Sequence, residues 1–173
     1  MHSLILGGAR SGKSALAERI ARDGVDDVVV LATAQALDAE MQTRIAYHRA
    51  ARSTHWAVVE EPLHVAQALA RASRSGRCVI VDCLSLWLSN LLCSTEAGIF
   101  ERERDALLDV LNDLPGRLLL ISNEVGLGVI PMGELTRRYV DEAGRLHQQL
   151  ATRCSNVIFC VAGLPHVLKG ALP

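Results

Sequence analysis

The stretch that decides the fold of this chain is Gly7-Gly8-Ala9-Arg10-Ser11-Gly12-Lys13-Ser14, which matches the phosphate-loop pattern G-x-x-x-x-G-K-[ST]. It follows a short apolar run, Ser3–Leu6, and precedes a helix-forming run, Ser14–Ala21. The pattern requires this context of strand, loop and helix. Successive backbone N–H groups and the positive end of the helix can then surround phosphate oxygens. The context disfavours the alternative, a glycine-rich turn that matches by chance.

Side chains in and beyond this loop have expected roles in phosphate chemistry. Lys13 can reach the β and γ phosphates of a nucleotide, and Ser14 can ligate Mg²⁺. The apolar run Arg77–Asp82 ends in a carboxylate, as a Walker B strand does. Asp82 can hold Mg²⁺ through water or act as a base on an acceptor hydroxyl; a helix cap is its alternative role. These residues predict binding of a nucleoside triphosphate with Mg²⁺, without separating a kinase from an ATPase, a GTPase or a nucleotidyltransferase.

Short apolar runs alternate with amphipathic stretches along the chain. The runs predicted as strands are Ser3–Leu6, Val28–Thr33, Trp56–Val59, Arg77–Asp82, Arg117–Ser122 and Asn156–Val161, and helices are predicted at 13–23, 38–52, 62–74, 84–92, 99–113 and 133–153. Four strand runs are continuously apolar, which is typical of parallel strands covered on both faces. We therefore predict one α/β P-loop domain over residues 1–173, with a mostly parallel, doubly wound, RecA-like sheet. The tail Gly163–Pro173 is a candidate for a short antiparallel edge strand.

Two helix starts carry a specific signal. Asp38 and Glu40 put negative charge at the start of the second predicted helix, where the helix dipole favours it. Pro62 stands where the third would begin, and its fixed φ suits a first helical turn.

The composition excludes several classes of protein. The 173 residues carry a net charge of −1, so nothing suggests a nucleic-acid binder. No apolar run approaches the roughly 18 residues of a membrane span, and the first residues do not form a signal peptide, so we expect a cytoplasmic protein. The five cysteines include no C-x-x-C pair, which argues against a zinc site.

One helix face stands out by its charges. Arg44, His48 and Arg52 are spaced four apart and so lie on one face of the second predicted helix, with Arg49 beside them. Two neighbouring guanidiniums disfavour protonation of an imidazole, and a neutral imidazole can attack phosphorus. The alternative is a solvated basic face. Two further histidines, His64 and His147, sit in ordinary helix patterns.

Together these stretches resemble the bifunctional adenosylcobinamide kinase / adenosylcobinamide-phosphate guanylyltransferase family. The resemblance runs from residue 3 to about 163. It rests on Gly7–Ser14, Leu31–Thr33, Asp38–Arg44 with Ile45 and His48, Asn123–Pro131, and then Asp141, Gly144 and Gln148. The phosphate loop alone is generic, but D-x-E-M-x-x-R-I-x-x-H followed by N-E-V-G-x-G-x-x-P about 75 residues later is specific.

The resemblance implies two activities. ATP or GTP would phosphorylate the aminopropanol hydroxyl of adenosylcobinamide. GMP would then pass from GTP to His48 and on to the corrinoid phosphate, which makes His48, Lys13 and Asp82 the expected catalytic residues. The implied nucleotide site comprises Gly7, Gly8, Ala9, Arg10, Ser11, Gly12, Lys13, Ser14, Ala32, Thr33, Ala34, Arg44, Arg49, Arg52, Glu60 and Asp82, with Ser14 and Asp82 holding Mg²⁺. A homotrimer is implied as well.

The segment Asn123–Pro131 follows the fifth predicted strand at the edge where α/β folds bind ligands. Its Glu124 could orient Mg²⁺ or the acceptor hydroxyl; a solvated loop carboxylate is the alternative. The chain departs from the family pattern F-R-D-x-x-G-x-x-N-Q at Tyr139-Val140-Asp141 and His147-Gln148, which leaves corrinoid or subunit contacts open. Two other functions also stay open: a plain small-molecule kinase without a covalent intermediate, and a nucleotide-dependent binding module without metabolite turnover.

Overall fold

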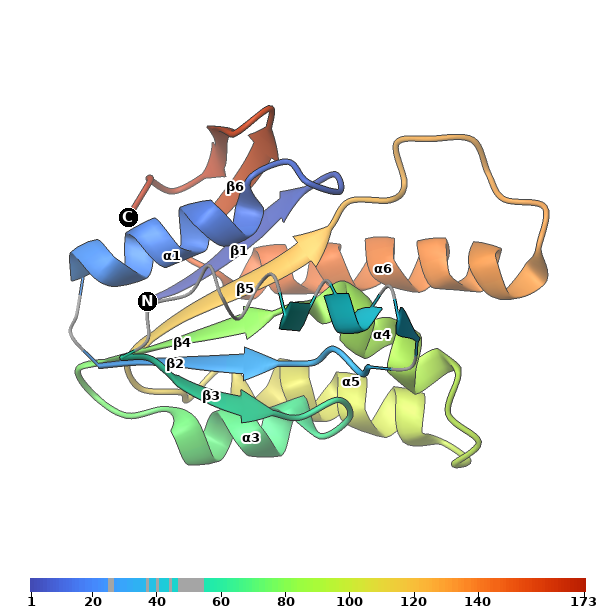
Figure 1. The fold of residues 1–173 in the computed structure, drawn as a ribbon, viewed down its shortest axis with the longest axis horizontal. Helices are drawn as coiled ribbons and strands as arrows, with labels where there is room; N and C mark the ends of the chain where they lie inside the picture. Colours follow the sequence, from blue (N-terminus) through green and yellow to red (C-terminus); the bar gives the residue numbers. More distant parts are fainter. Residues whose placement is uncertain (25–26, 37, 40, 44, 47–54) are drawn as a thin grey trace.

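The strands form a single mixed sheet with a parallel body. The computed structural model describes residues 1–24, 27–36, 38–39, 41–43, 45–46 and 55–173. In chain order the strands are β1 (His2–Gly7), β2 (Asp27–Ala32), β3 (Ala57–Glu60), β4 (Arg77–Asp82), β5 (Arg117–Asn123), β6 (Asn156–Val161) and β7 (Leu164–Lys169). Across the sheet the order is β3-β2-β4-β5-β1-β6-β7 (Figure 1). All neighbours pair in parallel except β6 and β7, which are antiparallel.

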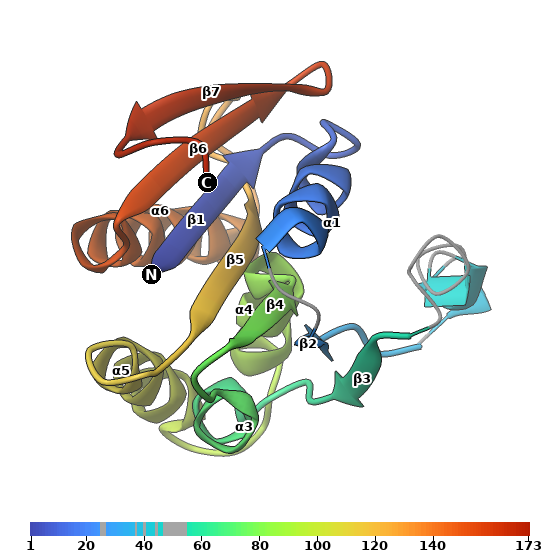
Figure 2. The same ribbon diagram turned by 90° about the vertical axis from the view of Figure 1, so that its left-hand side faces the viewer.

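Helices cover both faces of this sheet. They are α1 (Lys13–Gly24), α3 (Val65–Ala72), α4 (Leu84–Leu92), α5 (Ile99–Val110) and α6 (Glu134–Arg153). Helix α1 lies on one face, and α3 to α6 lie on the other (Figure 2). The prediction of an α/β fold with a mostly parallel, doubly wound sheet and an antiparallel edge strand is thus confirmed.

The alternation of side chains along each strand divides the core into two layers. In β1, Leu4 and Leu6 pack with the layer beneath α3 to α6, whereas Ile5 packs with the layer beneath α1. Because both layers are apolar, the central strands β1, β2, β4 and β5 are buried almost throughout. Strand β3 is exposed along its length and forms one edge of the sheet.

Two helix boundaries lie three residues from their predicted positions. The third helix begins at Val65 and not at Pro62. The Glu61 carboxylate accepts hydrogen bonds from the N–H groups of Leu63 (3.0 Å) and His64 (2.9 Å), which closes a turn before the helix. Helix α5 ends at Val110 rather than at 113, because the next N–H groups bond three residues back: Asn112 donates to the carbonyl of Asp109 (3.3 Å) and Asp113 to that of Val110 (3.2 Å), which forms a turn.

The start of the second predicted helix is confirmed. Residues 39, 41–43, 45 and 46 are helical. The Asp38 carboxylate accepts a hydrogen bond of 2.7 Å from the N–H of Met41, as an N-terminal cap does. Glu40 and the rest of this helix lie outside the described residues. Among the described residues, no helix is both long and apolar enough to cross a membrane.

Candidate active site

The phosphate loop connects β1 to α1 with the backbone that its pattern predicts. Gly7 and Gly12 have φ angles of 152° and 98°, and Arg10 has a φ of 55°. The N–H of Ser11 donates to the carbonyl of Gly8 (3.3 Å), and the N–H of Leu16 donates to that of Gly12 (2.9 Å), so the loop tightens into the first turn of the helix. Positive φ angles turn backbone N–H groups toward a common centre, which makes a concave site for an anion.

Lys13 is the first residue of α1 and is only 7% exposed. Its Nζ donates a 2.6 Å hydrogen bond to the carbonyl of Gly8, so the ammonium is held inside the turn. Burial lowers the pKa of Lys13, while the nearby groups of Cys83, Cys160 and Asp82 act in the opposite direction. A partly desolvated ammonium interacts more strongly with a phosphate than a fully hydrated one does.

The C-terminal hairpin supports this loop from outside. The N–H of Gly163, at the turn between β6 and β7, donates to the carbonyl of Ser11 at 2.9 Å. A Cβ added at Gly12 would lie 3.0 Å from the Cα of Gly163, and one added at Gly7 would lie 2.4 Å from the carbonyl oxygen of Cys160. These close approaches explain why both positions are glycine.

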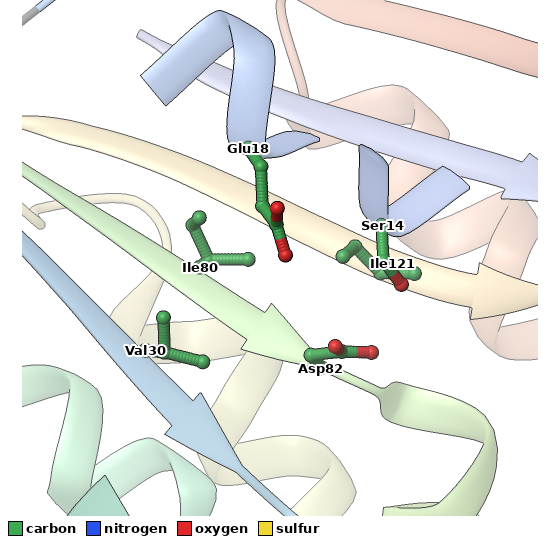
Figure 3. A pocket seen from close by; sticks show the side chains of 6 residues that line it. All are labelled: Ser14, Glu18, Val30, Ile80, Asp82 and Ile121. Atoms are coloured by element: carbon green, nitrogen blue, oxygen red, sulfur yellow. The ribbon is translucent and has the colours of Figure 1, made fainter. Parts of the chain in front are cut away.

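Three oxygen-bearing side chains surround a small hollow beside the loop. Ser14 and Glu18 of α1 face Asp82 at the end of β4, over a floor of Val30, Ile80 and Ile121 (Figure 3). Hydroxyl and carboxylate oxygens are the donors that Mg²⁺ prefers, so this donor set fits the expected metal. The structure thus brings Ser14 and Asp82 together. Glu18, one helical turn after Ser14, was missed, although its i, i+4 spacing from Ser14 is a signal that could have found it.

Thr33 links the ends of β2 and β4. Its side chain is fully buried, and Oγ1 donates to the carbonyl of Cys83 (2.7 Å) and accepts from the N–H of the same residue (3.0 Å). The hydroxyl therefore fixes the backbone just after Asp82. A direct contact between Thr33 and a nucleotide stays a prediction.

The remaining predicted residues are distributed along the carboxyl edge of the sheet. In the strand register, Glu60 of β3 is opposite Ala32, and Ala32 is opposite Asp82. Glu60 is exposed and lies four strands from Gly7, roughly 19 Å at about 4.8 Å per strand. Ala34 is half-buried, and Ala9 and Arg10 are exposed on the phosphate loop. Arg44, His48, Arg49 and Arg52 lie outside the described residues, so their predicted roles stay predictions.

Glu124 occupies the same edge, immediately after β5 and beside the phosphate loop. Its N–H donates to the carbonyl of Gly7 at 3.0 Å. Its Oε1 accepts a 2.6 Å hydrogen bond from the N–H of Gly126, and its Oε2 lies 3.5 Å from Nδ1 of His147. His147 was assigned to an ordinary helix pattern, yet it is buried against this carboxylate. The sequence signal that could have found it is the helical spacing of His147 from the apolar residues Ala143, Leu146 and Leu150, which form the buried face of α6.

Comparisons with known proteins identify the family of this chain and a similar fold. The model of a family described as cobinamide kinase / cobinamide phosphate guanyltransferase matches residues 3–168. A Pseudomonas aeruginosa protein named bifunctional adenosylcobalamin biosynthesis protein CobP is 59% identical over 170 residues, which is 98% of each chain. The Escherichia coli protein named bifunctional adenosylcobalamin biosynthesis protein CobU is 34% identical over 183 residues, which cover 98% of this chain and 100% of that one. A solved structure from Pyrococcus horikoshii has a TM-score of 0.57 at 8% identity, covering 98% of this chain and 86% of that one, and shows the fold alone.

Proposed function

Because the chain belongs to the cobinamide kinase / cobinamide phosphate guanyltransferase family, whose members are bifunctional enzymes, we propose that it carries out two successive reactions on one corrinoid. It phosphorylates the aminopropanol hydroxyl of adenosylcobinamide with ATP or GTP. It then transfers GMP from GTP to the new phosphate, which yields adenosylcobinamide-GDP and pyrophosphate. The observation that carries the proposal is the phosphate loop with buried Lys13 beside the hollow of Ser14, Glu18 and Asp82.

In the kinase step, the corrinoid hydroxyl oxygen attacks the γ-phosphorus, and the bond to the β–γ bridging oxygen breaks. The loop N–H groups and Lys13 stabilise the charge on the phosphoryl oxygens. The hydroxyl proton passes to a carboxylate at the sheet edge, for which Asp82 and Glu124 are the candidates. Bound Mg²⁺, held by Ser14 and Asp82, would neutralise charge on the β and γ phosphates.

In the guanylyl step, the neutral imidazole of His48 attacks the α-phosphorus of GTP, and pyrophosphate leaves. An oxygen of the corrinoid phosphate then attacks the same phosphorus, the P–N bond breaks, and the imidazole is regenerated. The covalent intermediate divides one displacement into two, each at an activated phosphorus. Arg44 and Arg52, one turn on either side of His48 in the sequence, would keep the imidazole neutral and hold the phosphates.

The proposal includes a corrinoid contact and a trimer. After β5 the chain leaves the sheet as a long loop and returns into α6 (Figure 1). Leu127, Val129 and Met132 of this loop are 81%, 95% and 95% exposed. Exposed apolar side chains in such number mark a surface that a ligand or another subunit covers. A light-scattering mass of three chains would support the trimer, and a monomer mass in the presence of GTP would contradict it.

Labelling with α-³²P-GTP and Mg²⁺ tests the covalent step. Wild-type protein should retain label that is acid-labile and alkali-stable after denaturation, as a histidine phosphoramidate is, and His48→Ala should retain none. The matched control is His55→Ala, which removes an exposed histidine seven residues later in the sequence and should leave the label intact. Folded, GTP-binding wild type without label would remove the covalent step and favour the plain kinase.

A further inference from the structure

His147 lies on the buried face of α6, where it reaches the end of β5. The residue is 6% exposed. Its Nε2 is 2.8 Å from Oγ of Ser122, the penultimate residue of β5. Its Nδ1 is 3.5 Å from Oε2 of Glu124. The imidazole therefore stands between a buried hydroxyl and a carboxylate at the candidate site.

The surroundings decide which ring nitrogen carries the proton. Burial lowers the pKa of His147, and the Glu124 carboxylate opposes this shift. In a neutral ring only one of the two nitrogens carries a proton. If that proton were on Nε2, the lone pair of Nδ1 would face a carboxylate oxygen. With the proton on Nδ1, the ring donates toward Glu124 and Nε2 accepts from the Ser122 hydroxyl. Nδ1 is buried and makes no hydrogen bond to a described residue; Oε2 of Glu124, at 3.5 Å, is the charged oxygen that faces it, and an unpaired buried donor is costly.

Glu124 is thereby approached from two sides. The N–H of Gly126 binds Oε1 at 2.6 Å, and the imidazole faces Oε2. The backbone of the same residue is tied to the phosphate loop through the carbonyl of Gly7. Since the carboxylate is only 21% exposed, its remaining open side is limited. A carboxylate held in this way keeps one orientation relative to the bound phosphates.

We propose that His147 is a positioning residue: through Nδ1–H it holds the Glu124 carboxylate in the orientation that the phosphoryl-transfer step needs. This inference rests on the proposed function of Glu124 at the acceptor or metal. His147 itself touches neither substrate, since it is buried behind the carboxylate. The Ser122–His147–Glu124 arrangement is not a hydrolytic triad, because Ser122 is 2% exposed and its hydroxyl has no access to a substrate carbonyl.

Two near-isosteric substitutions separate the two ends of the ring. In His147→Asn, the amide N–H₂ takes the place of Nδ1 and can still donate to Glu124. In His147→Gln, the amide takes the place of Nε2 and retains only the Ser122 contact. For the kinase step, His147→Gln should lower kcat at least tenfold, toward the roughly 100-fold loss that a 1 Å misplacement can cause. His147→Asn should keep kcat within about threefold of the wild-type value, a change that corresponds to about half the free energy of one hydrogen bond. The Kd for GTP should not change in either. Equal kcat values for the two variants would overturn the inference.

A double-mutant cycle with Glu124→Gln separates this inference from the role on which it rests. If His147 acts through Glu124, His147→Gln should lower kcat no further once Glu124 is Gln. Losses that multiply would mean that His147 acts in another way, with the role of Glu124 intact. A Glu124→Gln enzyme with wild-type kcat would remove that role, and the inference with it, while the His48 label would still test the second reaction.

The wild-type protein provides a readout that does not depend on how the variants fold. A two-dimensional ¹H–¹⁵N spectrum of the histidine rings should show a proton on Nδ1 of His147 at pH 7.5, with His147→Asn identifying the signal. The neutral Nε2–H tautomer, which has no proton on Nδ1, would contradict the proposal.

Discussion

Thr33→Val should destabilise the protein by removing one hydroxyl from the end of the sheet. The substitution keeps the shape of a fully buried side chain but loses both hydrogen bonds to Cys83. The carbonyl of Cys83 keeps a second donor, the N–H of Trp87 at 3.2 Å, so losing the hydrogen bond from Oγ1 of Thr33 to this carbonyl costs about 1 kcal/mol. The N–H of Cys83 has Oγ1 as its partner and would be left buried without one, at about 1–3 kcal/mol. The expected loss is therefore about 2–4 kcal/mol.

Urea unfolding followed by circular dichroism measures this loss. With a slope near 2 kcal/mol per M, the midpoint should fall by about 1–2 M at unchanged slope. The control is Thr33→Ser, which keeps the hydroxyl and gives up one methyl, worth about 1 kcal/mol. Because Cys83 follows Asp82, Thr33→Val should also raise the Mg²⁺ concentration needed for half-maximal activity, whereas Thr33→Ser should not. The reasoning is refuted if Thr33→Val unfolds within about 0.5 kcal/mol of wild type, or if the serine variant loses as much.

Three further perturbations follow from the same geometry. Gly12→Ala forces an L residue to a φ of 98° with its Cβ against Gly163. It should lower the free energy of unfolding by about 1–3 kcal/mol and weaken GTP binding in calorimetry. The control Gly8→Ala, whose added Cβ meets nothing within 4 Å, should keep wild-type stability. Asp82→Asn should abolish most Mg²⁺-dependent turnover while metal-free GTP binding persists, and full activity at ordinary Mg²⁺ would contradict its role. Burial lowers the pKa of His147 in the folded protein, so the unfolded chain protonates this imidazole first as the pH falls below about 6.5. The free energy of unfolding should therefore decline there by at most about 1.4 kcal/mol per pH unit. Urea unfolding of His147→Asn between pH 7.5 and 5.5 should lack this part of the decline, and the same pH slope in variant and wild type would contradict the prediction.

The fold was predictable because its determinants are local. The phosphate-loop pattern fixes a strand, a turn and a helix, and the continuously apolar runs indicate strands that are buried on both faces. The start of α3 was not predictable from Pro62 alone, since the competing event is the capture of two N–H groups by the Glu61 side chain. Such a choice depends on a single side-chain rotamer, which composition and periodicity do not report.

The candidate site was predictable where chemistry follows chain order and not where it depends on packing. Lys13, Ser14 and Asp82 could be chosen because a motif and a strand end place them. The pairing of Glu124 with His147 joins residues from β5 and α6, and only the packing of α6 beneath β5 brings them together. Likewise the sequence suggests Thr33 as a nucleotide contact, whereas its hydroxyl has its partner in the backbone of Cys83.

Mass spectrometry of the corrinoid products most directly tests the claim that one chain catalyses both reactions and uses His48 only for the second. Wild-type protein supplied with adenosylcobinamide, ATP, GTP and Mg²⁺ should convert it to the phosphate and then to the GDP derivative. His48→Ala should stop at adenosylcobinamide phosphate, and Lys13→Met should form neither product. An adenosylcobinamide-GDP product from His48→Ala, or wild type that never proceeds beyond the phosphate, would contradict the account.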